Sequence, residues 1–193
     1  MSDSPKILTF AGSLRAESYN KKLARVAAAA LAEQGAQVTH IDLRDYRLPV
    51  YDGDLEAEEG LPENALRLKE LFKANHGFWI ASPEYNSSIP GPLKNMLDWV
   101  SRPAAGEVTL EAYTGKVIAL TSASPGALGG MRALVHLRAM LGNIGAFVIP
   151  SQVSVSRAHE AFTPEGALVD PKVQDSINRL AKSLVEITGK LKP

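Results

Sequence analysis

Residues 82–99 read Ser82-Pro83-Glu84-Tyr85-Asn86-Ser87-Ser88-Ile89-Pro90-Gly91-Pro92-Leu93-Lys94-Asn95-Met96-Leu97-Asp98-Trp99. They follow the apolar run 78–81, which is typical of a buried strand. The second half predicts a helix, because its apolar residues recur at the spacing of one buried helical face and prolines suit a first helical turn. The loop between strand and helix is either an ordinary connection or a place that receives a flat polar ligand.

The rest of the chain alternates in the same way between apolar runs and amphipathic segments. Strands are expected at residues 6–11, 37–41, 117–121 and 146–149, besides 78–81. Helices are expected at 20–34, at 62–74, around 134–141 and from the Asp170-Pro171 start to Gly189. Leu66, Leu68, Leu71 and Phe72 form the expected apolar set of the second helix, and Leu134, Val135, Met140 and Leu141 that of the third.

Five strands that alternate with helices predict an α/β fold, a doubly wound five-stranded parallel sheet with helices on both faces. The strand order 2-1-3-4-5 fits this count, although the spacing alone does not show the order. If that order holds, a ligand binds beyond the carboxyl ends of strands 1, 3 and 4. The long acidic segment 43–61 either covers a site, makes an interface or is a solvated connection.

The composition limits the class of protein and its partners. The 193 residues predict a single domain over 1–193, with 45% apolar and 22% charged residues, and Lys plus Arg equals Asp plus Glu at 21 each. This balance favours neither nucleic acid nor an anionic membrane. The absence of cysteine excludes disulfides and thiol catalysis. We expect a cytoplasmic protein, since the N-terminus has no signal-peptide core and no segment reaches transmembrane length.

The loop after the first strand has the chemistry of a phosphate site. Residues 12–20 read Gly-Ser-Leu-Arg-Ala-Glu-Ser-Tyr-Asn and combine hydroxyls, an amide, a guanidinium and a helix start. Arg15 offers charge-assisted hydrogen bonds, which are roughly twice as strong as neutral ones. Alternatively, Ser18 or Asn20 only caps the helix. The glycine patterns of dinucleotide fingerprints and Walker loops are both missing.

Two of these motifs together resemble those of the NADPH-dependent FMN reductase family, flavodoxin-like NAD(P)H-dependent reductases of quinones, chromate and azo dyes. The segment from Pro83 to Trp99 is similar to the family's Pro-Glu-Tyr-Asn signature, and the loop matches its Gly-Ser-x-Arg-x-x-Ser-x-Asn pattern. The resemblance spans roughly residues 6–148 and implies a flavodoxin-like fold. It also implies an FMN cofactor, whose phosphate and ring are held by Ser13, Leu14, Arg15, Ser18, Tyr19, Asn20, Pro83, Glu84, Tyr85, Asn86 and Ser122.

The implied reaction passes two electrons from NADPH or NADH through flavin N5 to a quinone or similar acceptor, with ping-pong kinetics. The cofactor performs this chemistry, so no catalytic residue is expected. Three alternatives stay open: a flavodoxin-like electron carrier that docks to proteins, a flavin-binding module without turnover, and a reductase that releases free reduced FMN. Zero net charge counts against the carrier, which usually has a strongly acidic face.

Other residues are expected to have structural roles. The Glu84 side chain is expected to point away from the flavin, toward solvent or a subunit partner, because a carboxylate beside a reduced flavin is unfavourable. Trp79 is expected in the core and Trp99 in the core or an interface. None of the four histidines has metal-ligand spacing. The resemblance further implies a homo-oligomer, either a dimer or two dimers paired into a tetramer, with segment 43–61 and the helix of Trp99 as candidate contacts.

Overall fold

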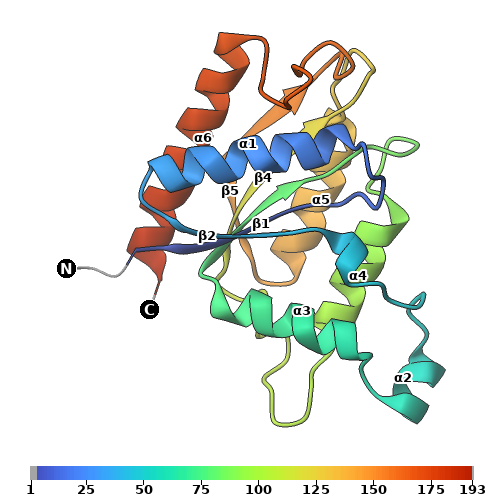
Figure 1. Cartoon of the computed structure of the whole chain (residues 1–193). Coiled ribbons are helices and arrows are strands. Elements are labelled where there is room, and N and C mark those ends of the chain that lie inside the picture. The colour runs from blue at the N-terminus through green and yellow to red at the C-terminus, as the bar shows by residue number, and fades with distance from the viewer. Residues whose placement is uncertain (1–3, 193) are drawn as a thin grey trace.

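A computed structural model describes residues 4–192 as one parallel five-stranded sheet with helices on both faces (Figure 1). The strand order is β2-β1-β3-β4-β5, and all four neighbouring pairs are parallel. This confirms the flavodoxin-like order 2-1-3-4-5. The strands are β1 (Lys6–Ala11), β2 (Gln37–Ile41), β3 (Gly77–Ala81), β4 (Val117–Ala123) and β5 (Phe147–Val155).

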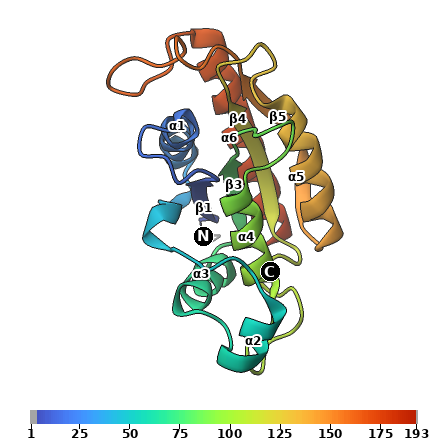
Figure 2. The same ribbon diagram turned by 90° about the vertical axis from the view of Figure 1, so that its right-hand side faces the viewer.

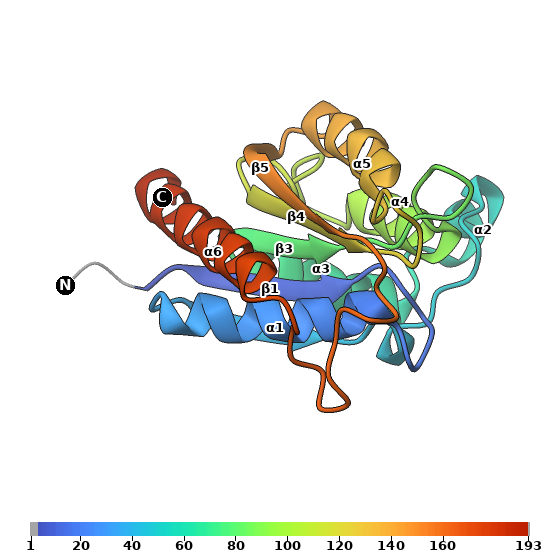
Figure 3. The same cartoon turned by 90° about the horizontal axis from the view of Figure 1, so that it is seen from above.

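The helices form two layers, one on each face of the sheet (Figures 2 and 3). Helices α1 (Tyr19–Glu33) and α6 (Pro171–Leu191) cover one face. The other face is covered by α3 (Glu63–Ala74), α4 (Gly91–Ser101) and α5 (Met131–Asn143). A short helix, α2 (Gly53–Glu59), and a 3₁₀ turn at Leu43–Asp45 lie between β2 and α3. No helix of residues 4–192 has the length and apolar character needed to cross a membrane.

Alternate residues of each central strand enter opposite cores. Ile7 and Trp79 pack with α1 and α6, whereas Leu8, Phe78 and Ile118 pack with α3, α4 and α5. All seven residues of β4 are buried, as expected for a strand that is covered on both faces. Trp79 is fully buried, so its expected place in the core is confirmed.

Several sequence expectations about element boundaries and faces are wrong. Strand β4 runs to Ala123 rather than 121, and β5 runs to Val155 rather than 149. Two expected core residues, Leu66 and Val135, are 42% and 60% exposed. Segment 43–61 contains helix α2, which begins at the capping carboxylate of Asp52 and ends at Gly60.

The segment after β2 is fastened to α4. The Asn95 side chain accepts from Tyr51 N–H (2.8 Å) and donates to the Pro49 carbonyl (2.8 Å). The indole N–H of Trp99 donates to the same carbonyl at 2.9 Å. Trp99 is fully buried within its own chain. Its indole is therefore unavailable as a surface for another subunit.

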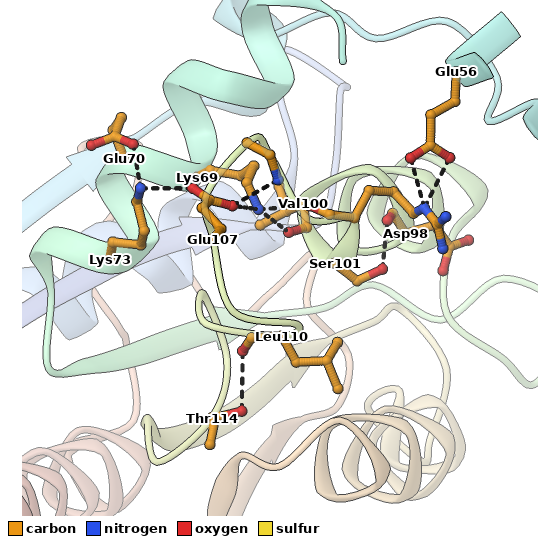
Figure 4. A network of polar contacts seen from close by, with 12 residues as sticks. Glu56, Lys69, Glu70, Lys73, Asp98, Val100, Ser101, Glu107, Leu110 and Thr114 are labelled. Carbon is orange, nitrogen blue, oxygen red and sulfur yellow. Dashed lines mark hydrogen bonds and ion pairs between the residues drawn. The ribbon is translucent and has the colours of Figure 1, made fainter. Parts of the chain in front are cut away.

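A charge cluster holds the loop that connects α4 to β4 (Figure 4). The buried Lys69 ammonium lies 2.8 Å from a Glu107 carboxylate oxygen, and Lys73 lies 2.7 Å from the other. Lys69 also donates to the Arg102 carbonyl at 2.7 Å. Burial opposes ionisation of Glu107, but these two lysines and the Ala104 N–H outweigh it and lower its pKa to about 2.

We predict that Glu107→Gln lowers the free energy of unfolding at pH 7 by about 3 kcal/mol, because it leaves the Lys69 charge buried and uncompensated. The pKa of Glu107 is lowered on folding from 4.5 to about 2. Its ionised form therefore stabilises the fold above pH 4.5, and that contribution is lost as the pH falls toward 2. Urea unfolding of parent and variant at several pH values should show a difference that shrinks below pH 4.5. A difference that is independent of pH would contradict the assignment.

Candidate functional site

The loops after β1, β3 and β4 meet at the carboxyl edge of the sheet and line one polar cavity. Backbone hydrogen bonds join them: Gly12 N–H donates to the Ala81 carbonyl (2.9 Å), and Ser82 N–H donates to the Thr121 carbonyl (2.8 Å). The cavity lies where the strand order reverses, at the carboxyl ends of β1, β3 and β4. Its lining residues are Ser13, Arg15, Ser18, Tyr19, Asn20, Pro83, Glu84, Tyr85, Ala123, Ser124 and Pro125.

The turn after β1 passes against the start of α4 with no space for a side chain at Gly12. A Cβ atom there would lie 2.7 Å from Leu93 Cδ2, closer than a carbon contact allows. Ser13 is buried and its hydroxyl accepts from Arg15 N–H at 3.2 Å. The Arg15 guanidinium is exposed, lies 5.7 Å from the Tyr19 ring centre and donates to the Glu17 carbonyl at 2.6 Å. These contacts place a cation at the rim of the cavity.

Ser18 occupies the N-cap position of α1, but its hydroxyl makes no capping hydrogen bond. The first backbone N–H groups of an α-helix have no acceptor within the helix, and Tyr19 and Asn20 in this turn line the cavity. The turn therefore offers a hydroxyl, backbone donors and the positive end of a helix. This is the donor set that a phosphate group requires.

The Asn20 side chain does not project into the cavity as a free donor. Its amide nitrogen donates to the Ala123 carbonyl (2.8 Å), and its oxygen accepts from Ala123 N–H (2.9 Å). Asn20 is 2% exposed. The side chain thus completes the hydrogen bonding at the end of β4 and joins it to the first turn of α1.

The turn that follows Glu84 has two non-glycine residues in the left-handed region, Asn86 (φ 51°) and Ser87 (φ 68°). Reciprocal hydrogen bonds between Tyr85 and Ser88 (2.9 and 3.1 Å) close it. Tyr85 is 49% exposed at the cavity, whereas Asn86 lies outside the cavity lining at the tip of the turn. The expected contact of Asn86 with the flavin stays a prediction.

The Glu84 carboxylate binds the start of α5, so the expectation that it points to solvent or a subunit partner is wrong. One oxygen accepts from the backbone N–H groups of Arg132 (3.0 Å) and Ala133 (3.2 Å). The other accepts from the Arg132 guanidinium. Burial opposes the charge, but these partners outweigh it and lower the pKa of Glu84. Gly130, which precedes α5, has no space for a side chain, since a Cβ there would lie 2.9 Å from the Ser122 side chain.

Ser122 and Leu14 also lie away from the polar cavity. The Ser122 hydroxyl donates to the Gly129 carbonyl at 2.6 Å and is fully buried, because β4 extends past it. On the β4 side of the cavity the lining serine is Ser124, the first residue after the strand. The apolar run ended at Thr121 in the sequence, and only the pairing of β4 with β5 shows that the strand continues to Ala123.

Leu14 lines a different cavity, of about 380 Å³, between residues 43–50 and the first turns of α4. This second cavity is mainly apolar, and its lining includes Leu43, Leu48 and Met96. Val50 at its edge is 83% exposed. The larger cavity borders the start of α4 at Gly91 and Pro92, but no serine or threonine lines it, so we assign the polar chemistry to the smaller cavity.

The histidines and carboxylates form no metal centre in the part of the chain that the structure describes. His40 lies 2.7 Å from the Thr9 hydroxyl and His136 lies 3.0 Å from the Ser88 hydroxyl. His159 lies 3.1 Å from Glu160. These contacts are those of structural or solvated histidines.

We predict that Asn20→Ala lowers the unfolding free energy of the ligand-free protein by about 2–4 kcal/mol, since it leaves the buried Ala123 N–H and carbonyl unpaired. Chemical denaturation measures the change, and Asn143→Ala on the exposed end of α5 is the control. Equal stability of parent and Asn20→Ala would show that the Asn20 amide is not part of the fold's hydrogen bonding.

Comparison with known proteins identifies the family. The model of the NADPH-dependent FMN reductase family matches residues 5–160. The chain is 35% identical over 191 residues to a probable NADPH:quinone oxidoreductase of Oryza sativa, covering 95% of this chain and 90% of the relative. It is 35% identical over 185 residues to an NAD(P)H-dependent FMN reductase of Pseudomonas aeruginosa, covering 95% of each.

Solved structures agree with the family match. The flavoenzyme NAD(P)H:(acceptor) oxidoreductase FerB of Paracoccus denitrificans superposes with a TM-score of 0.78 at 29% identity, covering 97% of this chain and 98% of FerB. An archaeal flavodoxin, 12% identical with a TM-score of 0.61, shares the fold and covers 95% of this chain and 98% of its own. From its motifs, its fold and these matches, the chain belongs to the NADPH-dependent FMN reductase family.

Proposed function

We propose that this protein is a quinone reductase that transfers two electrons from NAD(P)H to quinones at the cavity formed by the loops after β1, β3 and β4. Members of its family are oxidoreductases that use FMN with NAD(P)H as co-substrate. Several relatives are named quinone reductases or quinone oxidoreductases, and this supports quinones ahead of chromate, ferric complexes or azo dyes as acceptors. The observation that carries the proposal is the convergence of these three loops on one polar cavity.

The residues at the α1 end of the cavity fit the phosphate of FMN. Ser18 has a hydroxyl free of any helix cap, and the first turn of α1 supplies unpaired backbone donors. Arg15 adds a cation, and Ser13 holds the Arg15 backbone in place. We propose that Ser13, Arg15, Ser18, Tyr19 and the backbone of Asn20 hold the phosphate.

The other end of the cavity suits a flat ring. Pro83 and Tyr85 contribute rigid apolar surface, and Ala123, Ser124 and Pro125 line the cavity on the β4 side. When bound, FMN would supply the redox chemistry, which is the uptake of a hydride and the release of two electrons. The protein would position the ring, with the Glu84 carboxylate held by the start of α5, and would leave one side of the ring open. NAD(P)H and the acceptor then use that side in turn, and the kinetics are ping-pong.

We also propose that two copies associate as a dimer, through the cavity lined by Leu43, Leu48 and Met96 and the exposed Val50 beside it. An exposed apolar residue next to an apolar hollow suits a self-complementary contact, because a two-fold axis makes each surface face its own copy. Leu14 joins this cavity to the phosphate loop, so that a partner would lie near the site.

Since the reaction uses NAD(P)H, we propose that the protein acts in the cytoplasm.

We predict that the purified protein reconstituted with FMN oxidises NADPH or NADH in the presence of a quinone, with parallel lines in double-reciprocal plots. Intersecting lines would contradict the ping-pong scheme.

Arg15→Ala should weaken FMN binding by about 1.5–3 kcal/mol, the scale of a hydrogen bond to a charged group, and keep the fold. Fluorescence titration of the apoprotein with FMN measures this, with Arg179→Ala on α6 as the control. Unchanged binding by the Arg15 variant would remove Arg15 from the site.

We predict a dimer at micromolar concentration in light scattering, and dissociation on Val50→Asp, because a carboxylate at the apolar contact loses its hydration. Val108→Asp is the matched control, since Val108 is 74% exposed on another loop. A monomeric parent, or a Val50 variant that remains a dimer, would rule out this contact.

A further inference from the structure

The segment between β5 and α6 returns to the phosphate end of the site. Residues 161–169 form a small hairpin, with an antiparallel bridge between Phe162 and Leu168 and a 2.8 Å bond from Thr163 N–H to the Ala167 carbonyl. This hairpin lies beyond residue 160, where the match to the family model ends. In Figures 1 and 3 the orange-red segment before α6 passes beside the N-terminal half of α1.

Contacts before the hairpin and within it hold this segment against the rest of the fold. Before it, Ala158 is fully buried and its N–H donates to the carbonyl of Ser124, which lines the cavity (3.1 Å). Within it, Phe162 and Leu168 pack against the core between the sheet, α1 and α6. The hairpin is therefore seated on the fold next to the site.

Three side chains stack from the hairpin to the rim of the cavity. The ring of Phe162 lies parallel to that of Tyr19, with centroids 6.3 Å apart and an interplanar angle of 9°. The Arg15 guanidinium carbon lies 5.7 Å from the Tyr19 ring centre. Aromatic stacking and cation–π contact both act at these separations. The Tyr19 ring thus contacts both Phe162 and the Arg15 guanidinium.

We infer that Phe162 is a positioning residue for the FMN phosphate: it fixes the Tyr19 ring, and this ring fixes the Arg15 guanidinium at the rim. The inference rests on the proposed function, since it takes Arg15 to bind the phosphate. Arg15 is exposed, and within residues 4–192 its guanidinium makes one hydrogen bond, to the neighbouring Glu17 carbonyl. Without the ring beside it, the guanidinium would sample many rotamers, and ordering it on binding would reduce the affinity for the ligand.

The test compares FMN with riboflavin, which has the same ring and lacks the phosphate. Fluorescence titration of the apoprotein should show that Phe162→Ala raises the Kd for FMN about threefold to tenfold and leaves the Kd for riboflavin unchanged. Phe162→Tyr, which keeps the stacked ring, should restore FMN binding. Phe147→Ala removes a phenylalanine that is 48% exposed on β5 and is the control for loss of an aromatic side chain.

A double-mutant cycle locates the effect. In the Arg15→Ala background, Phe162→Ala should produce no further loss of FMN affinity, because the guanidinium through which it acts is gone. An equal loss for FMN and riboflavin, or an additive double mutant, would overturn the positioning role. If the parent binds neither ligand, the proposed function fails instead. Should Phe162→Ala fail to fold, Phe162→Leu replaces it, since Leu keeps apolar volume without a ring to stack.

Discussion

The pairing of the Asn20 amide with both backbone groups of Ala123 is the contact on which the site depends. It joins residues 103 positions apart and fixes the first turn of α1 to the end of β4. The phosphate end of the cavity is built on that turn, and its opposite wall begins at Ala123. Because the amide satisfies two buried groups at once, the first turn of α1 has little freedom to move relative to the strand.

The fold could be predicted from the apolar runs, because buried parallel strands and amphipathic helices have distinct periods. The ends of the strands could not be predicted in this way. Strand β5 continues through Pro150, which the apolar run did not predict, because an edge strand tolerates a residue without N–H. The shift in register after Ile118 and the hydrogen bonds from Arg138 to the Ile149 and Pro150 carbonyls accommodate it.

The sequence predicted which loops form the candidate site, but it did not predict what several side chains in those loops do. Motif matching named Asn20, Glu84 and Ser122, yet the side chains of all three are bound to other parts of the chain. The sequence did hold a signal for Glu84, since the N-cap of α5 is Gly130, which has no capping side chain, and an anion from elsewhere stabilises such a helix start. No comparable local pattern indicates Phe162, whose contact with Tyr19 spans distant segments.

The central claim is that one ligand occupies the cavity shared by the three strand ends, with its phosphate on the first turn of α1. Hydrogen–deuterium exchange of the apoprotein with and without FMN tests this most directly. The account predicts slower exchange on FMN binding at residues 13–20, 83–85 and 123–125, and unchanged exchange at 43–50. Protection confined to residues 43–50 and the start of α4, with none in the loop after β1, would place the ligand in the apolar cavity and contradict the account.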